Sequence, residues 1–248
     1  MSALIFALAA GAVIGLALGA LGGGGSVLAV PALIYLLGFT PVAATTASLV
    51  VVTVTSATAL SAHARGGHVR RRTGLLFAAA GIGPAMLGGP LAGHLPESVL
   101  TVAFVVAAAA AALRMLRSRP PSDRTVTVRP GRAAAAGAGL GAVTGVLGVG
   151  GGFLAVPALV GVLGLRMRAA VGTSLLVITV NSLAALAMRA GTVDGLDWTV
   201  IGPFAGAAIL GAWDGRRLAA KVSGHALQRI FALVLLAVAA FMLIDALV

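Results

Sequence analysis

The chain has 248 residues, of which 60% are hydrophobic and 9% are charged, whereas about 25% of the residues of an average soluble domain are charged. Its formal net charge is +11 and it contains no cysteine. This composition excludes an ordinary soluble domain and indicates a membrane protein, and the lack of cysteine excludes disulfides, thiolate metal sites and sulfur-based redox chemistry.

Uncharged stretches with helical rather than alternating periodicity follow one another along the chain. Lipid offers the backbone no hydrogen-bonding partner, so an apolar run of about 18 or more residues predicts a helix that crosses the membrane. We therefore expect an all-α, polytopic membrane protein. The ten expected segments, two of them short, cover residues 3–21, 26–38, 42–62, 74–93, 98–113, 133–149, 153–165, 169–188, 196–213 and 230–244.

The first segment could also be a cleavable signal peptide. It lacks the basic n-region of such a peptide, and more apolar sequence follows it at once. We therefore expect it to be a membrane helix of the protein.

Four consecutive glycines, residues 22–25, separate the first segment from a short one. Residues 26–38 would extend only about 20 Å as a helix, which is less than the hydrocarbon core of about 30 Å. We expect the chain to enter the membrane, break at the glycines and turn back as a short helix. Its first amide N–H groups would then be available to an anion.

Close helix packing is the alternative explanation for these glycines. Small residues spaced four apart allow two helix backbones to approach, and Gly11, Gly15 and Gly19 have this spacing. A second glycine-rich break, at residues 148–152, favours the functional explanation for the breaks, because packing alone would not require both.

Arginines gather in two of the gaps between segments. Short basic loops stay on the cytoplasmic side of a membrane, so these arginines explain the positive charge without a nucleic-acid partner. They are Arg65, Arg70, Arg71 and Arg72 in one gap, and Arg114, Arg117, Arg119, Arg124, Arg129 and Arg132 in the other.

The two halves of the chain have related sequences. Pro157 lies 126 positions after Pro31, and at this offset residues 15–33 align with residues 141–159. The order of the small residues is kept and not merely their number, which indicates an ancient duplication. The recurring pairs further on are Gly38 and Gly164, Ser48 and Ser174, Thr53 and Thr179, and Ser56 and Ser182.

The charge pattern gives the two halves opposite orientations. If both basic gaps are cytoplasmic, the helix at 42–62 runs inward and the helix at 169–188 runs outward. We thus expect two inverted repeats, residues 1–116 and 133–248, joined by a basic cytoplasmic linker at 117–132. Many secondary transporters have this arrangement, with broken helices and a substrate site near the midplane.

The paired motifs GALGGGGSVLAVPAL (19–33) and GVLGVGGGFLAVPAL (145–159), together with the glycine-rich GIGPAMLGGPLAG (81–93), resemble those of the TauE/SafE family. The resemblance covers nearly the whole chain. It implies a permease of the bacterial plasma membrane that exports sulfite or organosulfonates such as sulfoacetate. A related thiosulfate-uptake branch relies on cysteines, and their absence here argues against that activity.

The helix that follows each break carries polar residues along one face. Hydroxyl and amide groups there could donate hydrogen bonds to sulfonate oxygens without a buried charge. The alternative is that they bond to their own helix or hold helices together. Two arginines that end these helices, Arg65 and Arg189, could bind the anion at the two mouths, or could equally be interfacial residues that extend to headgroups.

Acidic and histidine residues lie in the gaps or near the ends of the segments. The usual signature of proton coupling is therefore missing, and an anion leaving a negative-inside cell is already driven outward by about 2.3 kcal/mol per charge per 100 mV. We expect potential-driven export with no cofactor and no metal. The alternatives are uptake of another small anion and a non-conducting accessory subunit, while no constellation for an intramembrane enzyme is present.

The expected partners are a small anionic substrate and the lipid bilayer, and the sequence leaves open both a single copy and a homo-oligomer of the chain. The candidate substrate-binding residues are Gly22, Gly23, Gly24, Gly25, Ser26, Thr45, Ser48, Thr55, Ser56, Arg65, Gly148, Gly150, Gly151, Gly152, Ser174, Asn181, Ser182 and Arg189.

Overall fold

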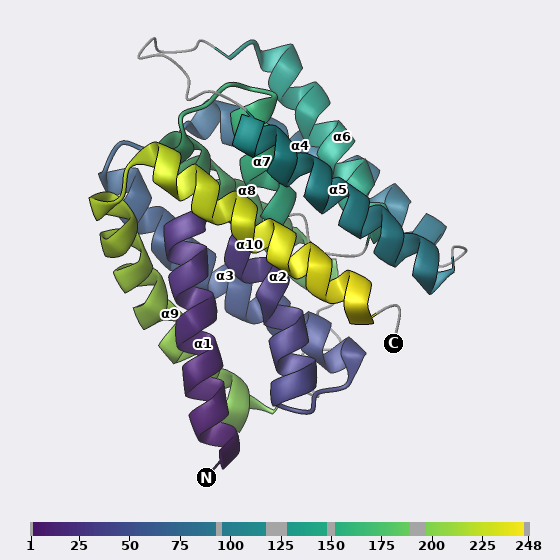
Figure 1. Ribbon diagram of the computed structural model, residues 1–248, viewed down its shortest axis with the longest axis vertical. Helices are drawn as coiled ribbons and strands as arrows, with labels where there is room; N and C mark the ends of the chain where they lie inside the picture. The colour runs from purple at the N-terminus through teal and green to yellow at the C-terminus, as the bar shows by residue number, and fades with distance from the viewer. Residues whose placement is uncertain (1, 93–95, 118–127, 148–151, 189–196, 246–248) are drawn as a thin grey trace.

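The computed structural model is an assembly of packed helices, and it describes residues 2–92, 96–117, 128–147, 152–188 and 197–245 (Figure 1). The described part contains helices and no strand, as expected for an all-α protein. The elements are α1 Ser2–Leu21, α2 Gly24–Pro31, the π-helix η1 Ala32–Leu36, α3 Pro41–Arg65, α4 Arg71–Ala92, α5 Glu97–Arg117, α6 Pro130–Leu147, α7 Gly152–Gly161, α8 Met167–Met188, α9 Trp198–Lys221 and α10 Gly224–Asp245.

Each of the ten expected segments corresponds to one α-helix, with η1 continuing α2. The largest difference is at α9, which continues through Arg216 and Arg217 to Lys221, although the uncharged stretch stops at residue 213. A charge ends the part of a helix that lipid can cover, but arginine and lysine are good helix formers, so the helix itself continues. Helix α9 therefore extends beyond the uncharged stretch that predicted it.

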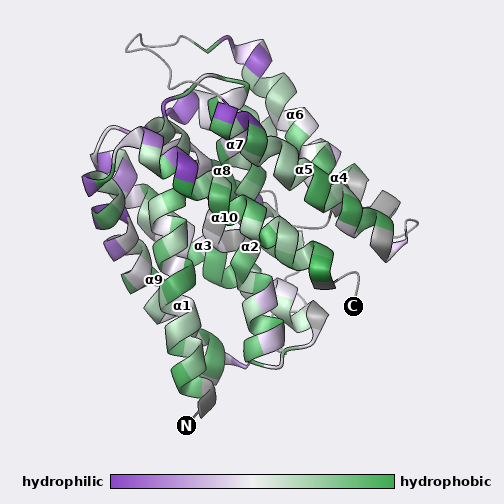
Figure 2. Cartoon of the chain, in the orientation of Figure 1, coloured by the Kyte–Doolittle hydropathy of each residue, from purple (hydrophilic) through white to green (hydrophobic). Residues whose placement is uncertain are grey.

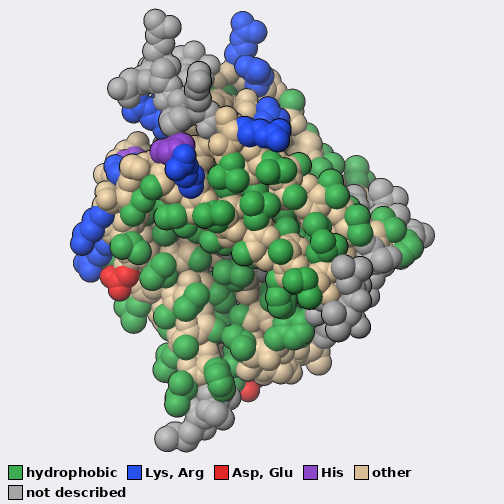
Figure 3. All heavy atoms as spheres, viewed as in Figure 1, with side chains coloured by type: hydrophobic (Ala, Val, Ile, Leu, Met, Phe, Trp, Pro, Cys, Tyr) green, Lys and Arg blue, Asp and Glu red, His purple; other side chains and the backbone are tan. Residues whose placement is uncertain are grey.

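Within the described ranges, five helices are long and apolar enough to cross a membrane, namely α1, α3, α5, α8 and α10. Large apolar side chains are exposed on the outer surface, including Leu87, Leu210 and Ile5. The coloured views show this apolar surface below one end that is more polar and basic (Figures 2 and 3). Exposure on this scale is unfavourable in water and is what a surface covered by lipid requires.

The first helix of each half packs against a helix of the other half. Helix α1 packs along α9 in the second half, and α6, at the repeat position of α1, packs along α4 in the first half. Both contacts use the same glycine spacing, and an added Cβ would collide with the facing backbone at Gly15 in α1 and at Gly141 in α6. The packing explanation for Gly11, Gly15 and Gly19 is therefore confirmed, because each faces backbone atoms of α9.

The short helices of the two halves end in the same cap. Gly38 and Gly164 both have positive φ, +70° and +67°. In each cap the glycine N–H donates to a carbonyl four residues earlier, and the next N–H donates to one six residues earlier. These two hydrogen bonds satisfy carbonyls that the end of a helix leaves without helical partners, and glycine is favoured at the turn because an L side chain is strained at positive φ.

Basic side chains gather at one end of the molecule (Figure 3). Hydrogen bonds join the chain segments there, since Arg216 Nη1 donates to Ala62 O (3.4 Å) and Arg168 Nη2 donates to Ala220 O (3.1 Å). The ends of α3 and α9 and the start of α8 thus lie together. The positive-inside rule predicts such an end to be cytoplasmic.

Candidate functional site

The break between α1 and α2 is narrower than the four glycines. Only Gly22 and Gly23 lie outside a helix, whereas Gly24 and Gly25 begin α2. Gly22 has φ +79°, in the left-handed region that L side chains rarely adopt. The N–H groups of Gly22 and Gly23 donate to Leu18 O and Leu21 O, so the i→i−4 ladder of α1 ends at Gly22. The predicted break is therefore confirmed for these two residues.

The break lies against the second half of the molecule. A Cβ added at Gly22 would be 2.5 Å from Ser174 Oγ, and one at Gly23 would collide with the carbonyl oxygen of Gly152, the first residue of α7. The starts of α2 and α7 therefore approach each other with no room for a side chain between them. Glycine is required at both positions by close approach and, at Gly22, also by its φ.

Two helix N-termini meet at this point. Each carries a partial positive charge of about half an elementary charge. Both starts are buried, and no side-chain hydrogen bond caps α2 at Gly23. Such a pair of helix ends has the polarity that favours an anion, and anion binding at the glycine breaks stays a prediction.

Several predicted residues cannot be placed at this point. Four of them lie outside the described residues, namely Gly148, Gly150, Gly151 and Arg189. Gly24 and Ser26 belong to α2, but the surroundings of Gly24 and of the Ser26 side chain are not described. Gly25 packs against the backbone of α1, where a Cβ would be 2.5 Å from Ile14 O.

The polar faces of α3 and α8 meet in the interior. Thr179 Oγ1 lies 2.9 Å from Ser56 Oγ, and both side chains are buried. Each oxygen is also within hydrogen-bonding distance of a carbonyl of its own helix, Leu175 O for Thr179 and Thr53 O for Ser56. Together they join the two polar faces across the halves.

Two of the predicted hydroxyl groups donate their hydrogen to their own helix. Ser48 Oγ donates to Thr45 O and Ser174 Oγ donates to Val171 O, both at 2.8 Å. A hydroxyl has one hydrogen, so in this arrangement it presents only lone pairs to the interior, which do not favour an anion. For Ser48 and Ser174 the structure therefore matches the alternative of bonding within a helix.

Three buried oxygen atoms in these helices have no hydrogen-bond partner among the described residues. They are Thr53 Oγ1 and Thr55 Oγ1 in α3 and Asn181 Oδ1 in α8. Thr55 and Asn181 occupy the same position in the two repeats. A buried polar group without a partner costs about 1–3 kcal/mol, and a bound ligand or water would remove that cost.

Thr53 and Thr179 are absent from the residues predicted from the sequence. The signal that could have identified them is their recurrence at the repeat offset. Of the remaining predicted residues, Thr45 is half-buried, Ser182 is buried, and Arg65 is exposed at the end of α3.

A buried histidine supports the end of α1. His63 Nε2 lies 3.3 Å from Gly19 O. The break leaves this carbonyl without its helical partner, because Gly23 N–H donates to Leu21 O instead. His63 is only 9% exposed, so its ring is held beside the break. The sequence alone predicts only that this histidine lies near a helix end.

The described residues contain no group of three or more His, Cys, Asp or Glu side chains that could hold a metal ion. The polar groups at the centre are hydroxyls, an amide and backbone N–H groups. Such groups bind anions by hydrogen bonding and do not suit a transition metal.

Comparison with known proteins gives one family. The family described as "Sulfite exporter TauE/SafE" matches residues 7–242. Two proteins from Xylella fastidiosa, strains Temecula1 and 9a5c, are each named "Probable membrane transporter protein". Each is 35% identical over 251 residues, which cover 98% of this chain and 96% of the relative.

Proposed function

Because the chain belongs to the sulfite exporter TauE/SafE family and is a multi-pass membrane transporter of bacteria, we propose that it exports sulfite or small organosulfonates such as sulfoacetate, driven by the membrane potential. The observation that carries the proposal is the meeting of the starts of α2 and α7 at Gly22, Gly23 and Gly152. Two positive helix ends approach there in a region where side chains are excluded.

The chemistry at this point suits an oxyanion. Sulfite and sulfonates present several oxygen acceptors, and the starts of α2 and α7 offer backbone N–H donors. On the polar faces of α3 and α8, Thr55 Oγ1 and Asn181 Oδ1 are also without partners among the described residues. An amide group can present its NH2 or its oxygen, since the two are assigned from the hydrogen-bond network. No fixed positive charge is needed at the centre, so the site would bind weakly enough to release the anion.

The arrangement of the halves supports a transport cycle. The contacts of α1 with α9 and of α6 with α4 join equivalent pairs of helices in the two repeats. We propose that the halves are inverted in the membrane, with the central glycines at the repeat interface. Transport would then proceed by movement of one packed unit against the other around a fixed central site.

The direction follows from the potential. The described part of the spanning helices offers no buried carboxylate to carry a coupled proton. A single negative charge moving outward across 100 mV gains about 2.3 kcal/mol, which corresponds to an outside accumulation of about fifty-fold.

Purified protein in liposomes would test the proposal. Vesicles loaded with sulfite or sulfoacetate should release the anion faster than protein-free vesicles, and a valinomycin-generated negative interior should accelerate release. Sulfate and chloride in parallel vesicles measure selectivity. Absence of flux of every anion would contradict the proposal and favour an accessory subunit, and faster movement into the vesicles against the potential would favour uptake.

A further inference from the structure

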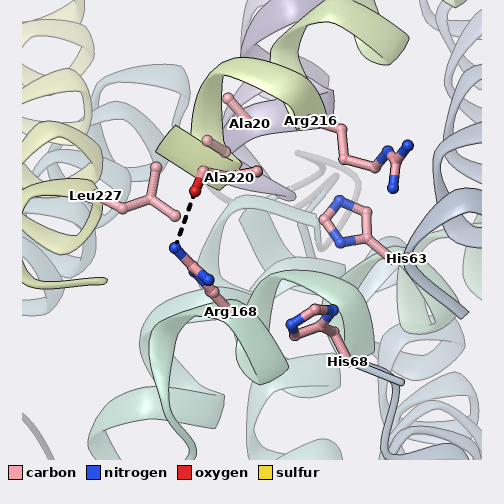
Figure 4. A pocket seen from close by; sticks show the side chains of 8 residues that line it. Ala20, His63, His68, Arg168, Arg216, Ala220 and Leu227 are labelled. Carbon is pink, nitrogen blue, oxygen red and sulfur yellow. Dashed lines mark hydrogen bonds between the residues drawn. The ribbon is translucent and has the colours of Figure 1, made fainter. Parts of the chain in front are cut away.

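A second polar region lies at the basic end, separate from the central glycines. A small open pocket of about 60 Å³ is formed there by the ends of α1, α3 and α9 and the starts of α8 and α10. Figure 4 shows His63, His68 and Arg168 around this space, with Arg216 beside His63. The lining residues are Ala20, His63, His68, Arg168, Arg216, Ala219, Ala220 and Leu227.

The charge of the pocket is not compensated. None of its lining residues is acidic, although two are arginines and two are histidines. The neighbouring carboxylate on α9, Asp214, is paired instead with Arg217 at 3.4 Å on the exposed surface. Positive charge in a partly enclosed space attracts an anion more strongly than the same charge in open water, because fewer water molecules screen it.

One donor in this region has no partner. Arg216 Nε is buried without a hydrogen bond among the described residues, while Nη1 of the same side chain donates to Ala62 O. Arg168 has a further role, since its Nη2 donates to Ala220 O and Val222 O at the end of α9. Guanidinium groups offer planar forked donors that match the oxygens of a sulfonate, sulfite or phosphate group.

The pocket is connected to the central break through the last turn of α1. Ala20 lines the pocket, and Gly22 begins the break two residues later. His63, which also lines the pocket, binds Gly19 O in the same turn. An anion in the pocket would therefore lie next to the segment that leads to the start of α2.

We propose that this pocket is an inner binding site for a small soluble oxyanion, where the transported anion binds before it passes to the central glycines. The proposal rests on the proposed function for the direction of movement. It assigns to Arg168 and Arg216 the role that sequence analysis gave to Arg65, which does not line the pocket.

A single introduced cysteine gives a local test, because the chain has no cysteine of its own. His68 lies in the loop between α3 and α4, where a substitution is tolerated more readily than in a helix. In the purified His68→Cys protein in detergent, sulfoacetate should slow alkylation by N-ethylmaleimide at least fivefold in a saturable manner. The slowing should disappear when Arg216→Gln is added and remain when Arg217→Gln is added, since Arg217 is on the same helix but outside the pocket.

The same assay separates two sources of an oxyanion. Protection by anionic phosphatidylglycerol vesicles but not by sulfoacetate would mean that the pocket binds a lipid headgroup, and would overturn the proposal. Equal protection in the Arg216→Gln and Arg217→Gln proteins would overturn it as well.

Transport gives an independent readout that does not depend on Arg216. His68→Glu would place a carboxylate in the pocket, and should raise the half-saturating internal anion concentration at least fivefold while leaving the external one unchanged. Equal effects on both sides, or none, would contradict an inner site. If sulfoacetate protects the cysteine of His68→Cys but the protein transports no anion, the inner site stands and the proposed function is refuted. If the protein transports the anion but sulfoacetate gives no protection, only the inner site is refuted.

Discussion

Gly22 and Gly23, which form the break between α1 and α2, lie against Ser174 and Gly152 of the other half of the chain. The run of four glycines and its recurrence predicted a break, and the structure places it at Gly22 and Gly23. The sequence could not tell which of the four adopt the turn, because glycine is compatible with both helix and turn. That choice depends on Ser174 and Gly152, which are distant in the sequence.

Gly22→Ala should impair transport more than the strain of an alanine at positive φ would alone. A Cβ at Gly22 is strained by the positive φ and also meets Ser174 Oγ at 2.5 Å. Gly38→Ala is the matched control, because Gly38 has a similar φ and no atom within 4 Å of the added Cβ. We expect each to cost about 1–2 kcal/mol of stability from strain, and only Gly22→Ala to abolish anion efflux. Equal efflux by the two variants would refute a role for the break.

Substitution of a threonine whose hydroxyl group has no partner tests whether that hydroxyl binds the anion or stabilises the fold. Thr55→Val removes a buried oxygen that has no partner, so the protein should become no less stable, while the half-saturating anion concentration should rise about fivefold, equivalent to about 1 kcal/mol. Thr58→Val is the control, since Thr58 Oγ1 donates to Val54 O. The measurements are melting temperature in detergent and efflux from liposomes. If the half-saturating anion concentration is unchanged in Thr55→Val, the Thr55 oxygen does not contact the transported anion.

At the scale of elements, hydropathy predicted where helices are but not how far they continue. All ten segments are helices, because an apolar segment surrounded by lipid or protein must satisfy its backbone hydrogen bonds within itself. The extension of α9 to Lys221 could not be predicted from hydropathy, because its last turns carry arginines that lie beyond the apolar part. One signal was available, since Arg216 follows Ala208 and Ala212 at a spacing of four on the buried face of α9.

Two glycines of α6 allow the effect of helix packing on stability to be measured separately from the effect of helix propensity. Gly141 faces the backbone of Gly81 in α4, whereas Gly139 has no atom within 4 Å of an added Cβ. Gly141→Ala should therefore lower the melting temperature by several degrees through a forced separation of the helices. Gly139→Ala should leave it unchanged or raise it, because alanine favours a helix over glycine by about 1 kcal/mol. A similar loss of stability in both would contradict the close α4 and α6 contact.

At the scale of the whole molecule, the repeat and the arginines together predict two inverted halves, and this orientation stays a prediction. The structure adds that the halves exchange helices, α1 with α9 and α6 with α4, which an alignment of the chain with itself does not show. The pocket of His63, His68, Arg168 and Arg216 was also beyond sequence reasoning, since its members come from three different helices and a loop.

Orientation in the membrane can be measured with two single cysteines. Arg71 and Thr199 are exposed at the starts of α4 and α9, which occupy equivalent places in the two repeats. For inverted halves, Arg71→Cys should react with an impermeant maleimide only from the cytoplasmic side, and Thr199→Cys only from outside. The unmodified chain, which has no cysteine, is the control. Labelling of both from the same side would exclude the inverted arrangement.

The most direct test of potential-driven anion export is the membrane potential at which net flux is zero. Liposomes containing the protein are given a known gradient of a singly charged organosulfonate, methanesulfonate, and the potential is set with potassium and valinomycin. Uncoupled movement of the anion predicts a shift of about 60 mV for each tenfold gradient, because about 1.4 kcal/mol balances about 2.3 kcal/mol per 100 mV. The doubly charged sulfoacetate should give about 30 mV. A zero-flux potential that ignores the anion gradient, or that shifts with a proton gradient, would contradict the mechanism.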